Sequence, residues 1–133
     1  MTQPASPMVL IVDDEDAVGQ FIRSLLEEQG YAAHVVHNGR EALAWLGERE
    51  AALIISDVMM PRVGGVQLAL RLWEDAKLKA VPLVLMSALG PPAGDFPPNV
   101  RATIGKPFRA EPLLAAVAEI LDGAAGRPPA GDQ

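Results

Sequence analysis

The stretch "MVLIVDDEDA", residues 8–17, joins five apolar residues to a segment in which four of the next five residues are acidic. A continuous apolar run of this length is typical of a strand that a parallel sheet buries on both faces. Asp13 and Asp14 follow at its carboxyl end, where two carboxylates about 4 Å apart repel by roughly 4 kcal/mol. The stretch therefore predicts a buried parallel strand that carries an acidic pair in need of a stabilising partner.

The rest of the chain alternates further apolar runs with segments of helical spacing. Four more strands are expected, at residues 31–36, 51–56, 81–86 and 101–105. Helices are expected to end at Gly30 and to cover residues 41–50, 65–75 and about 112–122. Strands that alternate with helices predict an α/β protein with a doubly wound, five-stranded parallel sheet. Right-handed crossovers favour the strand order 2-1-3-4-5, with helices on both faces.

Apolar residues at helical spacing identify the faces expected to be buried. In the first helix these are Val18, Phe21, Ile22, Leu25 and Leu26. In the third helix they are Val66, Leu70 and Trp73, and in the last helix Leu113, Leu114, Val117, Ile120 and Leu121. Trp45 is interpreted as a core residue in the same way. The second strand is shorter and more polar, so we expect it at a sheet edge, with His34 and His37 facing solvent.

Composition restricts the class of protein. The 133 residues suffice for one domain, half of them are apolar, and the formal net charge is −6. This charge argues against direct contact with nucleic acid or an anionic membrane. Cysteine is absent, which excludes disulfides and thiolate metal sites.

The ends of the chain differ from its middle. Residues 1–7 and 123–133 are rich in Pro, Gly and Ala and are expected to flank the domain at 8–122 as flexible segments. No apolar run reaches the ~20 residues that span a bilayer. The first residues also lack the basic start and apolar stretch of a signal peptide. We therefore expect a soluble, cytoplasmic protein.

Polar side chains follow four of the five expected strands. Asp13 and Asp14 follow the first, Asp57 the third, Ser87 the fourth and Lys106 the fifth. In an open parallel sheet, ligands bind beyond the carboxyl ends of the strands, where the strand order reverses. We therefore expect these residues to form one site, whose three carboxylates and one ammonium sum to −2.

Oxygen ligands without Cys or a His cluster favour Mg²⁺, which typically takes one or two carboxylates and keeps positions for water or phosphate. A carboxylate can also act as a covalent nucleophile in phosphoryl transfer. Lys106 and the Ser87 hydroxyl are suited to hold phosphoryl oxygens. The sequence therefore predicts a magnesium site that handles a phosphoryl group.

The segments "VDDE", "SDVMMP", "MSA" and "KPF" resemble the receiver domain of bacterial two-component response regulators, over about residues 8–122. The resemblance implies a flavodoxin-like fold and makes Asp57 the phosphoacceptor, supplied by a histidine kinase or phosphotransfer protein. It implies Mg²⁺ bound by Asp14, Asp57 and the Met59 backbone carbonyl, with Asp13 acting mostly through a metal-bound water. Lys106 and Ser87 would contact the phosphoryl group, and Ala88 would leave room for the donor.

The resemblance further implies a signalling switch that acts on a downstream protein, which the sequence does not identify, and not a turnover enzyme. It also implies that the Lys106–Pro107 bond is often cis, which an X-Pro bond tolerates at ~0.5–1 kcal/mol.

Two segments depart from the family pattern. Residues 89–100 contain prolines at 91, 92, 97 and 98, so we expect a loop, with at most one short turn, where receivers have a helix. Thr103 occupies the position three residues before Lys106, where receivers commonly carry Tyr or Phe as a switch. The output face is therefore expected to differ from that of the family.

Two alternative functions stay open at this stage. The first is a phosphorylation-independent protein-interaction module on a receiver scaffold, favoured by the altered output face. The second is a phosphohydrolase with an aspartyl nucleophile, whose D-x-D motif Asp14 and Asp16 match loosely. Asp16 is otherwise interpreted as a cap of the first helix.

Overall fold

The computed structural model describes residues 7–58, 64–88 and 97–124. Its elements, in chain order, are β1 (Met8–Val12), α1 (Asp16–Glu28), β2 (Ala32–Val36), α2 (Gly39–Leu46), β3 (Leu53–Asp57), α3 (Gly65–Trp73), β4 (Leu83–Ser87), β5 (Val100–Gly105) and α4 (Ala110–Ala124). All four strand pairings are parallel, and the strand order is β2-β1-β3-β4-β5. The predicted fold class and strand order are confirmed, and β2 is an edge strand as expected.

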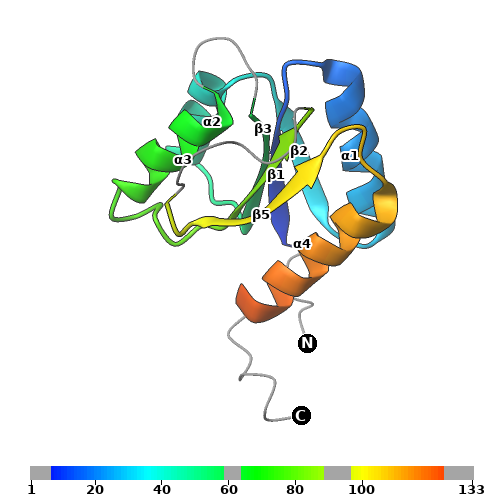
Figure 1. Ribbon diagram of the computed structural model, residues 1–133. Coiled ribbons are helices and arrows are strands. Elements are labelled where there is room, and N and C mark those ends of the chain that lie inside the picture. Colours follow the sequence, from blue (N-terminus) through cyan, green and yellow to red (C-terminus); the bar gives the residue numbers. More distant parts are fainter. Residues whose placement is uncertain (1–6, 59–63, 89–96, 125–133) are drawn as a thin grey trace.

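The sheet lies between two layers of helices (Figure 1). Helices α1 and α4 cover one face, and α2 and α3 cover the other. Strands β3 and β4 are buried along their whole length, which explains why their sequences are almost continuously apolar. Alternate residues of β1 point into the two cores, with Val9 and Ile11 on the α1 side and Leu10 and Val12 on the α2 side.

Helix α1 ends in a Schellman motif. Gly30 has a φ of 93°, a left-handed conformation that glycine adopts without steric cost. The amide of Gly30 donates to the carbonyl of Glu27, and that of Tyr31 donates to the carbonyl of Leu26. The predicted stop at Gly30 is therefore confirmed. The prediction that Phe21 belongs to the buried face of this helix is wrong, because its side chain is 53% exposed.

The buried face of α3 also differs from the prediction. Gly65, Leu68, Ala69 and Leu72 face the core, whereas Leu70 is 46% exposed and Val66 and Trp73 are half-buried. Both sets have helical spacing, so periodicity alone does not choose between them. The helix packs against β3 through Gly65, where the missing side chain permits the closest approach. Leu70 lies on the face of α3 that is exposed to solvent.

Other expectations near element ends are corrected as follows. Glu15, not Asp16, is the N-cap residue of α1, and Asp16 is the first helical residue. Helix α4 begins at Ala110 and extends beyond the expected boundary at 122, to Ala124. Pro112 still lies in its first turn, where no intrahelical amide is needed. The expected stripe of α4 is buried, with Leu114 partly so.

The expected loop at residues 89–100 and the expected flexible ends lie largely outside the described residues. Residues 97–99 form no helix, and Val100 begins β5. Arg101 is an extra residue in β5 relative to β4, because Leu83 pairs with Val100 and Val84 with Ala102. Among the helices described, none has the length and apolar character needed to cross a membrane.

The tryptophans expected in the core lie at its edges. Trp45 is half-buried, and its ring stacks on that of His34 at 5.5 Å between centroids. Trp73 is half-buried too, with Nζ of Lys79 4.9 Å from its ring centroid. His34 and His37 are exposed, as predicted.

Candidate functional site

The register of the sheet brings the polar strand ends together. Val12 in β1 pairs with Ser56 in β3, so the next residues, Asp13 and Asp57, are neighbours at the carboxyl edge. Asp57 in turn pairs with Met86 in β4. Ser87 pairs with Gly105 in β5, and the backbone amide of Lys106 donates to the carbonyl of Ser87 at 2.8 Å.

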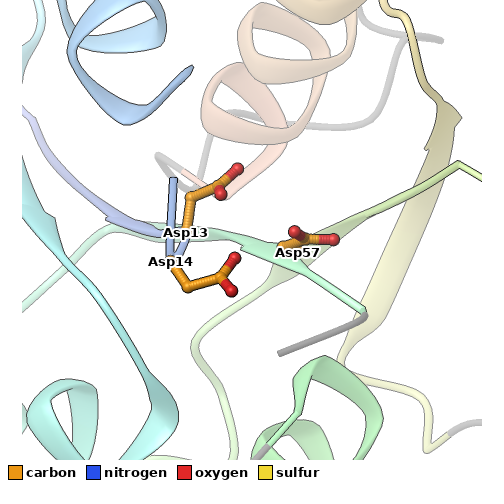
Figure 2. Close-up of side chains that lie close together, drawn as sticks. All are labelled: Asp13, Asp14 and Asp57. Atoms are coloured by element: carbon orange, nitrogen blue, oxygen red, sulfur yellow. The ribbon is translucent and has the colours of Figure 1, made fainter. Parts of the chain in front are cut away.

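The three acidic residues form one cluster. Asp13, Asp14 and Asp57 each offer a carboxylate oxygen, and these oxygens lie within 4.8 Å of one another. In Figure 2 the Asp13 and Asp14 side chains, at the end of β1, extend toward the side on which Asp57 lies. Asp13 is fully buried and Asp57 is 5% exposed, whereas Asp14 is open to solvent. Two of the charges are therefore held out of water, and the third is at the mouth of the site.

Local contacts position Asp13. Its amide donates to the carbonyl of Val36 at 3.0 Å, and its Oδ1 accepts a hydrogen bond from the amide of Glu15 at 2.9 Å. Burial has the largest effect on the pKa of Asp13 and raises it, whereas that hydrogen bond and Lys106 each lower it. The charge of Asp57 raises the pKa of Asp13 further. The surroundings of Asp13 therefore favour its protonated form in the absence of a bound cation.

Lys106 is the cationic group of the site. Its Nζ lies 3.1 Å from Oδ2 of Asp57 and 3.3 Å from Oδ2 of Asp13. A weaker contact, at 3.9 Å, joins it to Oε1 of the exposed Glu15. Burial by itself lowers the pKa of Lys106, but the hydrogen bonds and charges of Asp57 and Asp13 outweigh it and raise the pKa. Lys106 thus stays an ammonium ion at neutral pH.

A divalent cation fits this donor set. The cluster consists of carboxylate oxygens alone, the ligands that Mg²⁺ prefers, and its net charge with Lys106 is −2. Burial raises the pKa of Asp13, so a cation beside this carboxylate would favour its ionised form. Asp13, Asp14 and Asp57 are therefore the residues suited to hold the ion.

The remaining predicted site residues lie around this cluster. Ser87, which is 5% exposed, ends β4 beside the cluster, and Ala88 follows it in an exposed turn. Thr103 is half-buried in β5, paired with Leu85. The Lys106–Pro107 bond is cis, as the resemblance implied. Met59 lies outside the described residues.

An apolar groove of about 310 Å³ opens directly beside Lys106. It is lined by Glu15, Ala17, Val18, Phe21, Lys106, Pro107 and Phe108. The rings of Phe21 and Phe108 lie 6.0 Å apart between centroids. Sequence reasoning missed this groove because Phe21 has the spacing of a core residue. The run "KPF" after a strand was the signal that an aromatic ring lies near the lysine.

Sequence reasoning also missed the contacts of His37 with two acidic side chains. Nε2 of His37 lies 2.9 Å from Oδ1 of Asp16, and its Nδ1 lies 3.5 Å from Oε1 of Glu41. The hydrogen bond to Asp16 raises the pKa of His37, and the same bond lowers the pKa of Asp16. Asp16, the second acid of the loose D-x-D match, therefore has His37 as a side-chain partner.

Comparison with known proteins identifies the family. Residues 9–118 match the model of the response regulator receiver domain. The chain is 36% identical over 126 residues to Response regulator Rre1 of Synechocystis sp., covering 91% of this chain and 53% of the relative. It is 31% identical over 116 residues to Transcriptional regulatory protein SrrA of Staphylococcus aureus, covering 85% and 47%. The chain spans about half the length of these relatives.

Solved structures support the same family assignment. The signal receiver domain of a signal transduction histidine kinase from Syntrophus aciditrophicus superimposes with a TM-score of 0.82 at 30% identity, covering 93% of this chain and 96% of that one. Chemotaxis response regulator CheY4 of Vibrio cholerae gives a TM-score of 0.77 at 27% identity, covering 86% and 98%. The strand order, the acidic cluster with its lysine and these similarities agree that this chain belongs to the response regulator receiver domain family.

Proposed function

We propose that this chain is a Mg²⁺-dependent phosphorylation switch whose phosphoacceptor is Asp57. The observation that carries the proposal is the grouping of three carboxylates within 4.8 Å, with the Lys106 ammonium 3.1 Å from Asp57. An isolated acidic cluster is common on protein surfaces, but Asp13 and Asp57 are buried and share one lysine. A phosphoryl group on Asp57 would add negative charge, and the ammonium group of Lys106 lies close enough to pair with it.

In this reaction a carboxylate oxygen of Asp57 attacks the phosphorus atom of a phosphohistidine. The phosphorus–nitrogen bond of the donor breaks, its electron pair returns to the imidazole, and an acyl phosphate forms on Asp57. Lys106, now held by Asp57 and Asp13, would pair with the phosphoryl oxygens, and Ser87 would donate its hydroxyl to them. Bound Mg²⁺ supplies positive charge for the phosphoryl group and would be held by Asp14, Asp57 and the Met59 carbonyl, with Asp13 nearby.

The donor is proposed to be a histidine kinase or a phosphotransfer protein. A protein donor must cover the rim of the site, and the groove beside Lys106 offers apolar surface there. Phe21, 53% exposed, is the most accessible large apolar side chain of that groove. Burying it against a partner would provide the aromatic anchor that protein interfaces commonly use.

Mass spectrometry after incubation with Mg²⁺ and acetyl phosphate tests the proposal. We expect the mass of one phosphoryl group to appear on the parent chain and to be absent from Asp57→Asn. Asp122→Asn, which removes an exposed acid on α4, is the matched control and should be phosphorylated normally. No adduct on the parent chain, or an adduct that persists in Asp57→Asn, would contradict the assignment.

A phosphorylation-independent interaction module is the second candidate, and the observation that favours it is Thr103. A threonine at this position of β5 lacks the ring by which receivers usually link the site to their output face. Failure to form the adduct, combined with unchanged amide NMR spectra on adding beryllofluoride and Mg²⁺, would favour this module.

A further inference from the structure

Gly65, the first residue of α3, lies against the backbone of the proposed phosphoacceptor. A Cβ atom at this position would lie 2.6 Å from the carbonyl oxygen of Asp57 and 3.1 Å from Cα of Val58. The backbone of Gly65 is helical, so any residue could adopt its conformation. What excludes a side chain is space, and the obstacle is main chain that no rotamer change can move.

The peptide that follows Asp57 is held by further contacts. Oγ of the buried Ser56 donates to the Asp57 carbonyl at 3.0 Å. The amide of Val58 donates to the carbonyl of Met86 at 2.8 Å, and the carbonyl of Val58 accepts from the amide of Gly65 at 3.2 Å. The start of α3, together with Ser56 of β3 and Met86 of β4, therefore holds the backbone next to Asp57, whose side chain contacts Lys106.

We infer that Gly65 is a positioning residue for Asp57: its missing side chain lets α3 hold the Asp57 backbone where the carboxylate meets Lys106 and the other acids. The inference deepens the proposed function and rests on it for its effect on phosphorylation. A carboxylate displaced by a fraction of an ångström loses alignment with the groups that bind the phosphoryl oxygens. A single methyl group at residue 65 should therefore impair the reaction without touching any ionisable group.

Gly19 offers a matched control. It is also a buried helical glycine, and a Cβ there would lie 2.7 Å from Cγ1 of Val35. That obstacle is a side chain, so Val35→Ala removes it and leaves the Val35 Cβ at 3.7 Å. At Gly65, by contrast, Leu85→Ala would remove the Cδ2 atom at 3.1 Å and still leave the Asp57 carbonyl at 2.6 Å. The two glycines thus have similar crowding but different obstacles.

The experiment compares Gly65→Ala, Gly65→Ala/Leu85→Ala, Gly19→Ala and Gly19→Ala/Val35→Ala with the parent chain. The first measurement is the ¹³C chemical shift of the Asp57 carboxyl carbon in metal-free protein, assigned with Asp57→Asn. The second is the rate of phosphorylation by acetyl phosphate at saturating Mg²⁺. We expect Gly65→Ala to move the Asp57 resonance and to slow phosphorylation at least about tenfold, with no rescue by Leu85→Ala. Both Gly19 variants should keep the parent's resonance and, within about twofold, its rate.

An unchanged Asp57 resonance and rate in folded Gly65→Ala would overturn the inference, as would an equal loss in Gly19→Ala. If Gly65→Ala does not fold, Ser56→Ala tests the same peptide by removing the hydrogen bond to the Asp57 carbonyl. It should move the Asp57 resonance, and an unmoved resonance would count against the inference. A parent chain that forms no adduct rejects the proposed function alone, because the Asp57 resonance still decides the role of Gly65.

Discussion

The Nζ atom of Lys106 lies 3.1 Å from Oδ2 of Asp57, although the two residues are 49 positions apart in the chain. The same ammonium lies 3.3 Å from Oδ2 of Asp13, which is 93 positions away. One cation therefore holds two buried carboxylates that would otherwise repel each other. Replacing the lysine and replacing one of the carboxylates should therefore change the free energy of unfolding in opposite directions.

Lys106→Met should lower the free energy of unfolding of the metal-free protein by about 1–3 kcal/mol, because two buried carboxylates lose their charged partner. Mg²⁺ should raise the free energy of unfolding more in the variant than in the parent chain, since in the variant the ion does not compete with an ammonium group. Urea unfolding with and without Mg²⁺ measures both effects. Lys77→Met, at an exposed lysine in the turn that follows α3, is the control, and equal losses in the two variants would contradict the prediction.

Asp13→Asn should raise the free energy of unfolding of the metal-free protein. Burial raises the pKa of Asp13, so the folded state binds a proton more tightly than the unfolded state and ionised Asp13 costs stability at neutral pH. The amide oxygen of Asn can still accept the hydrogen bond from Glu15. We expect a gain of roughly 1 kcal/mol, the usual scale of a single substitution.

Urea unfolding at neutral pH without metal measures this gain, which should shrink as the pH falls and Asp13 becomes protonated. The stabilisation of the protein by Mg²⁺ should weaken in the same variant. A variant that is less stable than the parent chain at neutral pH would show that Lys106 compensates Asp13 fully.

The His37–Asp16 bridge should make stability depend on pH. The pKa of His37 is raised above its ordinary value of 6.5, so the contribution of the charged ring is fully present below 6.5 and is lost as the pH rises through the raised pKa. The pKa of Asp16 is lowered below 3.8, so its contribution is lost only as the pH falls through that lower value. Glu41 also faces His37, and its charge raises the pKa of His37 further.

We therefore expect the urea concentration at the unfolding midpoint of the parent chain to decrease as the pH rises from about 6 to about 8. In His37→Gln this pH dependence should be weaker. His34→Gln removes the other histidine, which stacks on Trp45, and should leave the slope intact. A slope that survives in His37→Gln and disappears in His34→Gln would reverse the assignment.

Phe21→Ser should separate protein donors from small ones. The side chain is exposed in the groove and carries no polar or charged group that could take part in phosphoryl transfer, so phosphorylation by acetyl phosphate should stay within about twofold of the parent rate. Transfer from a phosphorylated histidine kinase that acts on the parent chain should fall about tenfold, the effect of 1.4 kcal/mol of lost binding. Leu70→Ser, at the exposed apolar residue of α3, is the control, and a parental transfer rate in Phe21→Ser would exclude the groove as the docking surface.

The family, the strand order and the grouping of the acids were predictable from local patterns. Continuous apolar runs identify strands buried on both faces, and Asp13, Asp57, Ser87 and Lys106 stand directly at or after strand ends. Because parallel strands end at the same edge of the sheet, these residues converge once the strand order is known. Gly30, too, is predictable, since a glycine after an amphipathic stretch commonly ends a helix.

Only the tertiary structure decided which of two helical stripes is buried and which contacts the side chains make. Leu70 and Leu72 are chemically alike, yet Leu72 is fully buried and Leu70 is 46% exposed, because only one face of α3 packs against the sheet. The same holds for Phe21, which lies beside Phe108 in the groove, and for Asp16, which meets His37 across 21 positions. Periodicity reports which residues share a face of one helix, whereas the packing of that helix against its neighbours determines whether the face is covered.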